Sequence, residues 1–312
     1  MEDSTQSLNI TLLCGGISAE RAVSLKSGQG VAAALRRRGH QVFVGDISPD
    51  DLTSLDHLPC DLVFPVLHGE FGEDGSLQKI LEERHIPFVG AGSAASRLAM
   101  DKQATKTALR HHGIPTPAWW LVTRESFAAG WRADSQRFPC VIKPASEGSS
   151  LACRICTDAP QAMEHLRSSL ADYSAMLVED LVVGPELTIG ILDGKSLPII
   201  EIRTSTGFYD YEAKYIRNDT EYHFKTNLPD HTLEQATAAA IATYHCVGAR
   251  HLSRVDLMVD GKTGQPCVLE INTLPGFTDH SLLPKAAAQV GIDFATLCHR
   301  LAQMAVRDTI WQ

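Results

Sequence analysis

Residues 254–272, with the sequence RVDLMVDGKTGQPCVLEIN, predict a β-hairpin that has one polar face. The runs VDLMV and CVLEI are short and rich in β-forming residues, and the turn-forming stretch DGKTGQP lies between them. If the two strands pair symmetrically about this turn, Asp256 lies opposite Glu270 and Arg254 lies opposite Asn272. Side chains alternate along a strand, so these four share one face. The other face then carries the apolar residues Leu257, Val259, Leu269 and Ile271.

The polar face of this hairpin has the chemistry of a cation site. Two carboxylates that face each other repel unless a cation lies between them. Oxygen ligands suit a hard ion such as Mg²⁺, which usually shares its coordination shell with substrate phosphates. A solvated hairpin edge that carries acids is the alternative. Because Arg254 and Asn272 complete the polar face and TLPG follows at once, we favour a magnesium–nucleotide site.

The composition is that of an ordinary globular protein. The chain has 312 residues, 44% of them hydrophobic and 21% charged, and is long enough for two or three domains. Its formal net charge of −9 argues against a general nucleic-acid binder. The amino terminus MEDSTQSLN is acidic, unlike a signal peptide, and no apolar stretch has the length of a membrane span. We therefore expect a cytoplasmic protein with no membrane or nucleic-acid partner.

The cysteines point to the same compartment. Eight cysteines are scattered without the spacing of a disulfide framework, which is typical of reduced thiols in a cytoplasm. Cys153 and Cys156 form a C-x-x-C, but they lie in the strand-like run LACRIC. An odd offset along a strand points the two thiols to opposite faces, so we do not expect a metal or redox pair.

The first hundred residues alternate between strand and helix patterns. This alternation predicts a small doubly wound α/β domain with a parallel sheet, whose ligands lie at the carboxyl ends of the strands. Gly15 and Gly16 and the stretch 68–75 lie at those ends. The expected strands are 8–14, 40–47, 61–68 and 86–90, and the expected helices are 19–39 and 76–85.

The rest of the chain predicts two further units. A helix from about 94 to 112 ends at Gly113-Ile-Pro, a typical helix terminator. The second unit is expected to contain a strand–turn–strand at 138–156, a helix at 158–173 and a strand at 175–182. The third unit is expected to be strand-rich from 191 and to contain a polar loop at 203–219, a helix near 233–247, the hairpin and a last helix. We therefore divide the chain into domains at 1–106, 107–190 and 191–312.

Several short motifs are compatible with a nucleotide. Lys143 ends the strand VIKP and precedes ASEGSS, a turn whose backbone N–H groups can hold phosphate oxygens. The turn lacks the P-loop pattern, so a Walker-type NTPase is not supported. Glu179 ends the strand LVE, where free backbone groups can pair with an adenine, and Glu186 lies where a carboxylate can bind ribose hydroxyls. Lys102 and these two glutamates are equally compatible with surface and loop positions.

The amino-terminal glycines do not form a dinucleotide fingerprint. Gly15 and Gly16 lack the G-x-G-x-x-G register, so nicotinamide chemistry is disfavoured although Asp46 ends the next strand. Glu20 lies where a helix begins, and it can interact with the helix dipole or receive the ammonium of a small substrate. His68 ends a strand and is either a buried, hydrogen-bonded histidine or a group that touches an anionic intermediate.

Together these pieces resemble one family, the D-alanine–D-alanine ligases of the ATP-grasp superfamily. The resemblance runs from about residue 8 to 301, and 115–137 is its least family-like stretch. It implies an ATP-grasp fold of α/β and α+β parts with an N-terminal doubly wound parallel-sheet domain. It also implies ATP-dependent joining of two D-alanines through an acyl phosphate, for peptidoglycan precursors. The motifs, in family order, are LLCGGISAERAVSLKSG, VLHGEFGEDGSLQ, MDK, VIKPASEGSS, GPELTIGIL, FYDYEAKY, RVDLMV and LEINTLPGFTDHSLLP.

The resemblance implies how ATP would be held. Phosphates would meet Lys102, Lys143 and the 146–151 turn with Ser149 and Ser150. Adenine would meet Glu179 and the backbone near Leu181, and ribose would meet Glu186. Lys214 would approach the transferred phosphoryl group. Two Mg²⁺ ions, with Mn²⁺ as a substitute, would be bound by Asp256, Glu270 and Asn272.

It also implies how the alanines would be held. Glu20 would bind the first ammonium with His68 close by. Gly276, Ser281 and Leu282 would surround the second carboxylate, and Arg254 would face the developing oxyanion. Glu20, Ser149 and Tyr215 would form a trio that closes the loop 205–220 and excludes water. A homodimer through the amino-terminal domain is implied as well.

Two other functions are compatible with much of the same sequence. A ligase that uses D-serine or D-lactate as the second substrate is the nearest alternative, and Tyr215 favours an amine nucleophile. A non-catalytic nucleotide sensor on the same fold would tolerate loss of Arg254 or Lys214, yet both are present.

Overall fold

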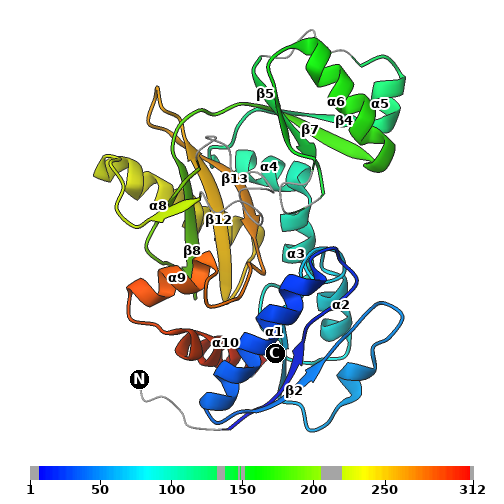
Figure 1. Cartoon of the computed structure of the whole chain (residues 1–312), viewed down its shortest axis with the longest axis vertical. Coiled ribbons are helices and arrows are strands. Elements are labelled where there is room, and N and C mark those ends of the chain that lie inside the picture. Colours follow the sequence, from blue (N-terminus) through cyan, green and yellow to red (C-terminus); the bar gives the residue numbers. More distant parts are fainter. Residues whose placement is uncertain (1–6, 132–137, 147, 149–151, 205–219, 310–312) are drawn as a thin grey trace.

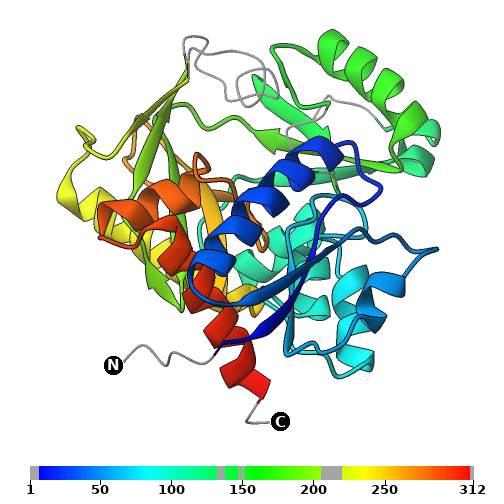
Figure 2. The same cartoon turned by 60° about the horizontal axis from the view of Figure 1, so that its bottom comes forward.

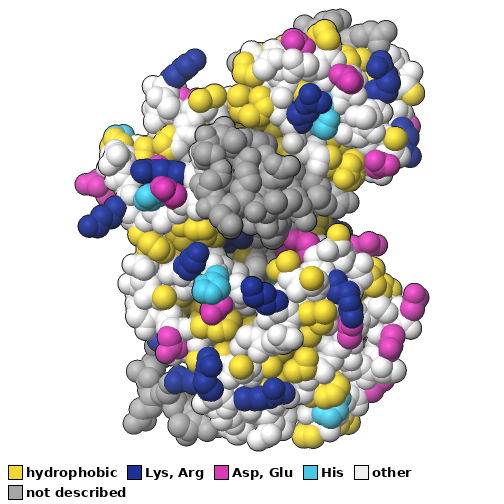
Figure 3. All heavy atoms as spheres, in the orientation of Figure 1, with side chains coloured by type: hydrophobic (Ala, Val, Ile, Leu, Met, Phe, Trp, Pro, Cys, Tyr) yellow, Lys and Arg dark blue, Asp and Glu magenta, His cyan; other side chains and the backbone are white. Residues whose placement is uncertain are grey.

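The computed structural model describes residues 7–131, 138–146, 148, 152–204 and 220–309. These residues form three sheets, which lie in a lower, an upper and a left-hand part of the view in Figure 1. Within the described residues, no helix has the length and apolar character needed to cross a membrane. Figure 3 shows that the outline of the molecule narrows between the upper part and the lower part.

The N-terminal sheet is parallel, as expected, with the strand order β2-β1-β3. Its strands are β1 (Asn9–Leu13), β2 (Gln41–Gly45) and β3 (Leu62–Pro65), with the helices α1 (Arg21–Arg37), η1 (Thr53–Asp56) and α2 (Ser76–Glu83). The strand expected at 86–90 is wrong: only an isolated bridge joins Phe88 to Val63. Pro87 has no N–H to donate, and Gly90 gives its N–H to His251 at 3.0 Å instead of to a ladder.

The single helix expected at 94–112 is also wrong. The structure has α3 (Ser93–Met100) and α4 (Lys102–His111), separated at Asp101. Asp101 has extended backbone angles, and its carboxylate accepts a hydrogen bond from the N–H of Ala104 at 2.9 Å. This is an N-cap, which satisfies a donor that the first turn of α4 would leave unpaired. The break turns α4 away from α3 and toward the central sheet, where the N–H of Lys102 meets the carbonyl of Ala145 at 2.9 Å.

The central sheet is antiparallel, with the order β4-β7-β5-β6. Its strands are β4 (Trp119–Thr123), β5 (Cys140–Pro144), β6 (Arg154–Cys156) and β7 (Ala175–Asp180), and its helices are α5 (Arg124–Ala128) and α6 (Ala159–Asp172). The expected strands at both ends of 138–156 are confirmed by the pairing of β5 with β6. Strand β4 lies within 115–137, the stretch without a family motif, and the sequence pattern did not predict it.

The C-terminal sheet has the order β11-β10-β8-β12-β13, with β9 beside β8. Its strands are β8 (Glu186–Leu192), β9 (Lys195–Ser196), β10 (Ile200–Arg203), β11 (Glu221–His223), β12 (Leu252–Val259) and β13 (Pro266–Asn272). Helix α8 (Asp230–Val247) packs on this sheet through a shared apolar core. The predicted hairpin is confirmed, because β12 and β13 pair with Arg254 opposite Asn272 and Asp256 opposite Glu270.

One detail of the predicted hairpin is wrong. The register shifts between Asp256 and Leu257, so that Leu257 faces Val268 rather than Leu269. Such a bulge adds one residue to one strand and reverses the alternation beyond it. Val268 is therefore fully buried in the core with Leu257 and Ile271, whereas Leu269 is only half-buried.

The last helix of the described residues packs against helix α1. The last helix expected from sequence is instead two helices, α9 (Leu282–Gln289) and α10 (Phe294–Thr309), separated near Gly291, whose φ of +78° suits glycine. Leu297 and Leu301 of α10 share an apolar core with Val31 and Leu35 of α1, and Figure 2 shows the two helices side by side. The limits proposed for the domains stay a prediction.

Candidate functional site

Asp256 lies at the centre of the polar face of the hairpin. Its side chain is nearly buried, and it accepts a hydrogen bond from the Thr188 hydroxyl at 2.6 Å. Arg254 donates to both carboxylate oxygens, from Nε at 2.9 Å and from Nη2 at 2.8 Å. Asn272 donates from Nδ2 at 3.2 Å. These donors hold the carboxylate in a fixed orientation.

Glu270 lies beside Asp256 on the neighbouring strand. Lys102, the first residue of α4, approaches it with 3.9 Å between Nζ and Oε2. Burial lowers the pKa of Lys102, and the charge of Glu270 opposes this shift. The sequence of Lys102 and its neighbours was also compatible with a surface position, but the side chain is buried and points toward the candidate cation site.

The hairpin face offers donors that fit Mg²⁺. Among the described residues, no three His, Cys, Asp or Glu side chains converge as a dedicated metal cage. Mg²⁺ does not need one, because it usually keeps several waters and uses one or two carboxylates with substrate phosphates. Asp256 and Glu270 supply two carboxylates. Asn272 directs its amide nitrogen to Asp256, which leaves its amide oxygen as the atom that can bind a cation.

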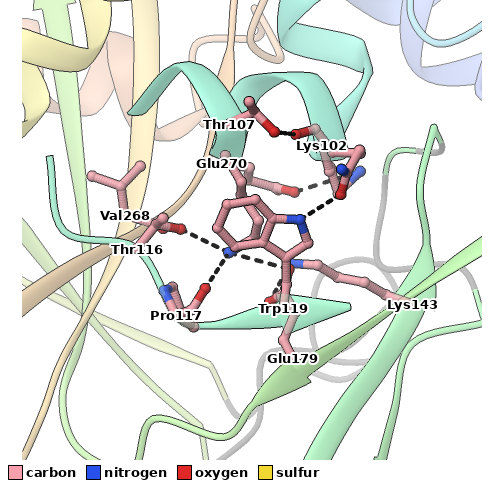
Figure 4. Close-up of polar contacts among 11 residues, drawn as sticks. Lys102, Thr107, Thr116, Pro117, Trp119, Lys143, Glu179, Val268 and Glu270 are labelled. Atoms are coloured by element: carbon pink, nitrogen blue, oxygen red, sulfur yellow. Dashed lines mark hydrogen bonds and ion pairs between the residues drawn. The ribbon is translucent and has the colours of Figure 1, made fainter. Parts of the chain in front are cut away.

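A second charged cluster surrounds Glu179, the fifth residue of β7 (Figure 4). This carboxylate is 2% exposed and lies 3.3 Å from Nζ of Lys106 and 3.1 Å from Nζ of Lys143. Burial alone would raise the pKa of Glu179, but Lys143 and Lys106 lower it below its ordinary value. Burial alone would lower the pKa of Lys143, but Glu179 and Glu270 raise it. Glu179 and Lys143 thus stay charged, although Glu179 is buried and Lys143 is only slightly exposed.

Lys106 is the residue of this cluster that the sequence analysis missed. It follows Lys102 by four residues on α4, a spacing that places both side chains on one helix face. Its Nζ also donates to the Thr116 hydroxyl at 2.7 Å and contacts the Pro117 carbonyl at 3.4 Å. The i,i+4 lysine pair in MDKQATK was the signal that could have found it.

The segment 181–185 joins the central sheet to the C-terminal sheet. It begins with Leu181, directly after β7, and leads into Glu186, the first residue of β8. Two of its carbonyls accept backbone hydrogen bonds from the turn of the β12–β13 hairpin, Val183 from Gly261 and Pro185 from Val259, both at 2.9 Å. The positions expected near adenine and ribose therefore lie next to the hairpin.

A cavity of about 240 Å³ joins the N-terminal part of the molecule to the hairpin. The residues that line it include Glu20 and His68 from the N-terminal part, Arg254, Glu270 and Asn272 from the hairpin, and Gly276, Ser281 and Leu282 from the segment that follows. The structure thus brings together all the described residues that were expected around the two alanines.

Glu20 and His68 occupy the N-terminal wall of this cavity. Glu20 takes the N-cap position of α1, but its side chain makes no capping hydrogen bond there. His68 is buried, with 3.9 Å between its Nδ1 and Oε1 of Glu73. Burial alone would lower the pKa of His68, but Glu73 and Glu20 raise it above its ordinary value. The histidine is therefore buried, as one reading expected, and it also faces two carboxylates.

The opposite wall contains the beginning of α9. Ser281 is the N-cap of this helix, and its Oγ accepts a hydrogen bond from the N–H of Thr278 at 3.0 Å. Leu282 and Leu283 begin the helix, where backbone N–H groups have no acceptor within the helix. Such a helix start favours an anionic group.

Some of the expected site residues cannot be placed. Ser149, Ser150, Lys214 and Tyr215 lie outside the described residues, as does most of the loop 205–220. Gly148 is described and lines the cavity, so the turn after β5 comes close to it.

Comparison with known proteins agrees with this geometry. Residues 108–303 match the family profile described as D-ala D-ala ligase C-terminus, and residues 51–91 match D-ala D-ala ligase N-terminus. A D-alanine–D-alanine ligase of Syntrophotalea carbinolica is 41% identical over 296 residues, which cover 95% of each chain.

Solved structures show the same likeness. The D-alanine–D-alanine ligase of Bacillus anthracis in complex with ATP superposes with a TM-score of 0.85 and 32% identity, covering 98% of this chain and 99% of that one. The VanG D-Ala:D-Ser ligase of Enterococcus faecalis has a TM-score of 0.84 and 26% identity, covering 96% and 100%. The fold and the site therefore define an ATP-grasp protein. Within that class, the chain belongs to the D-alanine–D-alanine ligase family.

Proposed function

We propose that this protein joins two D-alanines to D-alanyl-D-alanine and converts ATP to ADP and phosphate. The observation that supports it most directly is the cavity beside the hairpin. A carboxylate and a histidine line one wall of the cavity, and an arginine and a helix start line the other. Glu270 also lines the cavity, and Asp256 lies opposite Glu270 in the hairpin. A small zwitterion needs an acidic partner for its ammonium and a basic or N–H partner for its carboxylate, and the cavity offers each.

The chemistry proceeds in two displacements. A carboxylate oxygen of the first D-alanine attacks the γ-phosphorus of ATP, forms an acyl phosphate and expels ADP. The amine of the second D-alanine then attacks the acyl carbon, loses a proton, and expels inorganic phosphate from a tetrahedral intermediate. Arg254 lies on the cavity wall, where its guanidinium can stabilise the negative oxygen of that intermediate. Two hydrogen bonds to Asp256 hold the guanidinium in place.

Each alanine has proposed partners. Glu20 accepts the ammonium of the first alanine, and His68 lies beside that subsite. Gly276, Ser281 and Leu282 bind the carboxylate of the second alanine at the start of α9. The roles of Ser149 and Tyr215, which with Glu20 would close the loop over the site, rest on the family resemblance.

ATP binds between the central and C-terminal sheets. Lys102 and Lys143 hold its phosphates, Glu179 and the backbone at Leu181 meet the adenine, and Glu186 meets the ribose. Asp256, Glu270 and Asn272 hold Mg²⁺, with Mn²⁺ as a substitute; the ion supplies positive charge that neutralises the phosphates. Ser150 and Lys214 complete the set by resemblance.

We further propose a homodimer through the N-terminal part and a cytoplasmic location, where ATP is supplied. The homodimer rests on the family resemblance, and the location rests on the scattered cysteines, which are typical of reduced thiols. D-Serine and D-lactate are not favoured as second substrates, since the relative at 41% identity is a D-alanine–D-alanine ligase and the D-Ala:D-Ser ligase is only 26% identical.

The test is phosphate release from MgATP in the presence of each D- and L-amino acid and D-lactate, with mass spectrometry of the products. We expect D-alanine alone to give ADP and a dipeptide at the highest rate. A folded protein that forms no ADP with D-alanine contradicts the proposal, and a preference for D-serine or D-lactate contradicts the specificity. The reaction without an amino acid is the control for plain ATP hydrolysis.

A further inference from the structure

Helix α4 places one buried lysine against a glutamate of each of the two sheets. Lys102 lies 3.9 Å from Glu270 in the C-terminal sheet (Figure 4), and Lys106 lies 3.3 Å from Glu179 in the central sheet. The two lysines are four residues apart and therefore leave the same face of the helix. The function proposed above uses Lys102, Glu270 and Glu179, but it assigns nothing to Lys106.

The ammonium group of Lys106 is fixed on several sides. The side chain is fully buried, and besides Glu179 it meets the hydroxyl of Thr116 at 2.7 Å and the carbonyl of Pro117 at 3.4 Å. Thr116 is itself fixed, because its hydroxyl donates to the carbonyl of Val268 on β13 at 2.8 Å. A lysine held in this way cannot swing out to a ligand.

Lys143 is placed differently. It is the second partner of Glu179, at 3.1 Å, but its side chain is 12% exposed and it precedes the turn proposed to meet the phosphates. A lysine that neutralises Glu179 cannot give its full charge to a phosphate at the same time. If Lys143 were the only partner, moving it to ATP would leave a buried carboxylate without a counter-ion, which is strongly unfavourable.

We propose that Lys106 is a positioning residue for ATP: it is the fixed counter-ion of Glu179 and thereby frees Lys143 to pair with phosphate. This inference rests on the ATP site of the proposed function. Lys106 acts without touching the nucleotide, and its effect is confined to ATP binding rather than to the two displacements.

The test uses Lys106→Met, which keeps the aliphatic stem and removes the charge. The affinity for a non-hydrolysable ATP analogue with Mg²⁺, measured by isothermal titration calorimetry, should fall about tenfold or more. The KM for ATP should rise in parallel, while kcat and the KM for D-alanine stay within about twofold. Glu179 is itself placed at the adenine, so Glu179→Gln is the reference for the double variant: adding Lys106→Met to Glu179→Gln should change the affinity by less than about twofold, because Lys143 is then no longer needed by a buried carboxylate. Lys79→Met, an exposed ion-paired lysine on α2, is the matched control.

Two results would overturn the proposal. One is an unchanged analogue affinity in folded Lys106→Met, even if its melting temperature drops, because that is the signature of a purely structural lysine. The other is a loss of affinity on adding Lys106→Met to Glu179→Gln that equals the loss on adding it to the wild-type protein. Analogue binding does not require ligation, so a wild-type protein that binds the analogue but makes no dipeptide contradicts the proposed function alone.

If Lys106→Met does not fold, the pH dependence of analogue binding by the wild-type protein gives the same information. Burial lowers the pKa of Lys106 to about 8, although Glu179 opposes the shift. The lysine is charged below this pH and loses its proton above it, so affinity should weaken as the pH rises from about 7 to about 9. The titratable and charged groups that face Lys106 and its partners include Glu179, Lys143, Lys102, Glu270, Cys153, Cys267 and Arg110.

Glu179→Gln separates Lys106 from these neighbours. Its affinity should be independent of pH over the same range, because Lys106 then has no carboxylate to neutralise. Lys143 does not cause the effect, since its pKa is raised and it stays charged. A flat profile in the wild-type protein, or a loss that persists in Glu179→Gln, would overturn the proposal.

Discussion

Asp256 illustrates how much one carboxylate can organise. It accepts hydrogen bonds from Thr188 on β8, from Arg254 on its own strand and from Asn272 on β13. The same residue is therefore a candidate cation ligand and the group that orients the arginine on the cavity wall. A cation at this position must share the carboxylate with Arg254, so the two sites are coupled.

Removal of either carboxylate from the hairpin face should reduce turnover. We expect Asp256→Asn and Glu270→Gln each to lower kcat roughly 100-fold or more, because several kcal/mol of charge stabilisation is lost with the cation. Asp260→Asn is the control: it lies at the exposed end of the same hairpin and caps turn N–H groups, which asparagine can also do. The checks are kcat at saturating substrates and a circular dichroism spectrum that shows an intact fold. Near-normal turnover in both site variants would exclude the cation assignment.

Among the elements, α4 contributes most to the nucleotide side of the site. Asp101 starts it with a side-chain cap, and both buried lysines lie within its first five residues. The direction of this helix therefore decides where Lys102 and Lys106 point. Figure 4 labels Lys102 with Glu270, and Glu179 with its second partner Lys143.

The cap of α4 should be linked to ATP binding. We expect Asp101→Ala to cost about 1 kcal/mol of stability, the usual value for a lost N-cap. It should also raise the KM for ATP severalfold, because the first turn carries Lys102. Asp158→Ala removes an equivalent cap from α6, where Asp158 accepts from the N–H of Gln161 at 2.9 Å. It should cost similar stability and leave the KM for ATP unchanged. An equal change of KM in both variants would show that the effect is not local to α4.

The sequence predicted the hairpin register and the polar face because alternation and turn chemistry are local properties. It did not predict the break at Asp101, since 94–112 contains neither glycine nor proline and tertiary contacts with Ala145 decide the matter. The bulge after Asp256 was equally hidden, because Val268 and Leu269 are both apolar. Lys106 was missed because its partner Glu179 is distant in sequence and only the fold brings them together.

At the scale of the whole molecule, the segment 181–185 determines how the central and C-terminal sheets meet. Gly184 has a φ of +158° and lies very close to the hairpin turn: a Cβ there would be 2.0 Å from the carbonyl oxygen of Val259. Only glycine allows this approach. Because the ATP site lies between the two sheets, the contact is expected to affect both stability and the geometry of the site.

The Gly184 contact can be tested by a pair of substitutions. Gly184→Ala should lower the free energy of unfolding by about 2–4 kcal/mol, through overpacking and backbone strain. Gly130→Ala should cost about 1 kcal/mol, because φ is +97° there but no atom lies within 4 Å of the added Cβ. Urea denaturation measures both values. Equal losses of unfolding free energy would mean that the segment 181–185 does not pack tightly against the hairpin turn.

In the proposed reaction, the carboxylate of one D-alanine takes the γ-phosphoryl group of ATP before the peptide bond forms. D-Alanine labelled with ¹⁸O in its carboxylate tests this directly, by mass spectrometry of the inorganic phosphate and the dipeptide. Each phosphate released should carry one labelled oxygen, because the oxygen bonded to phosphorus leaves with it. The peptide carbonyl should retain the other. Dipeptide formed together with unlabelled phosphate would exclude an acyl phosphate as the intermediate.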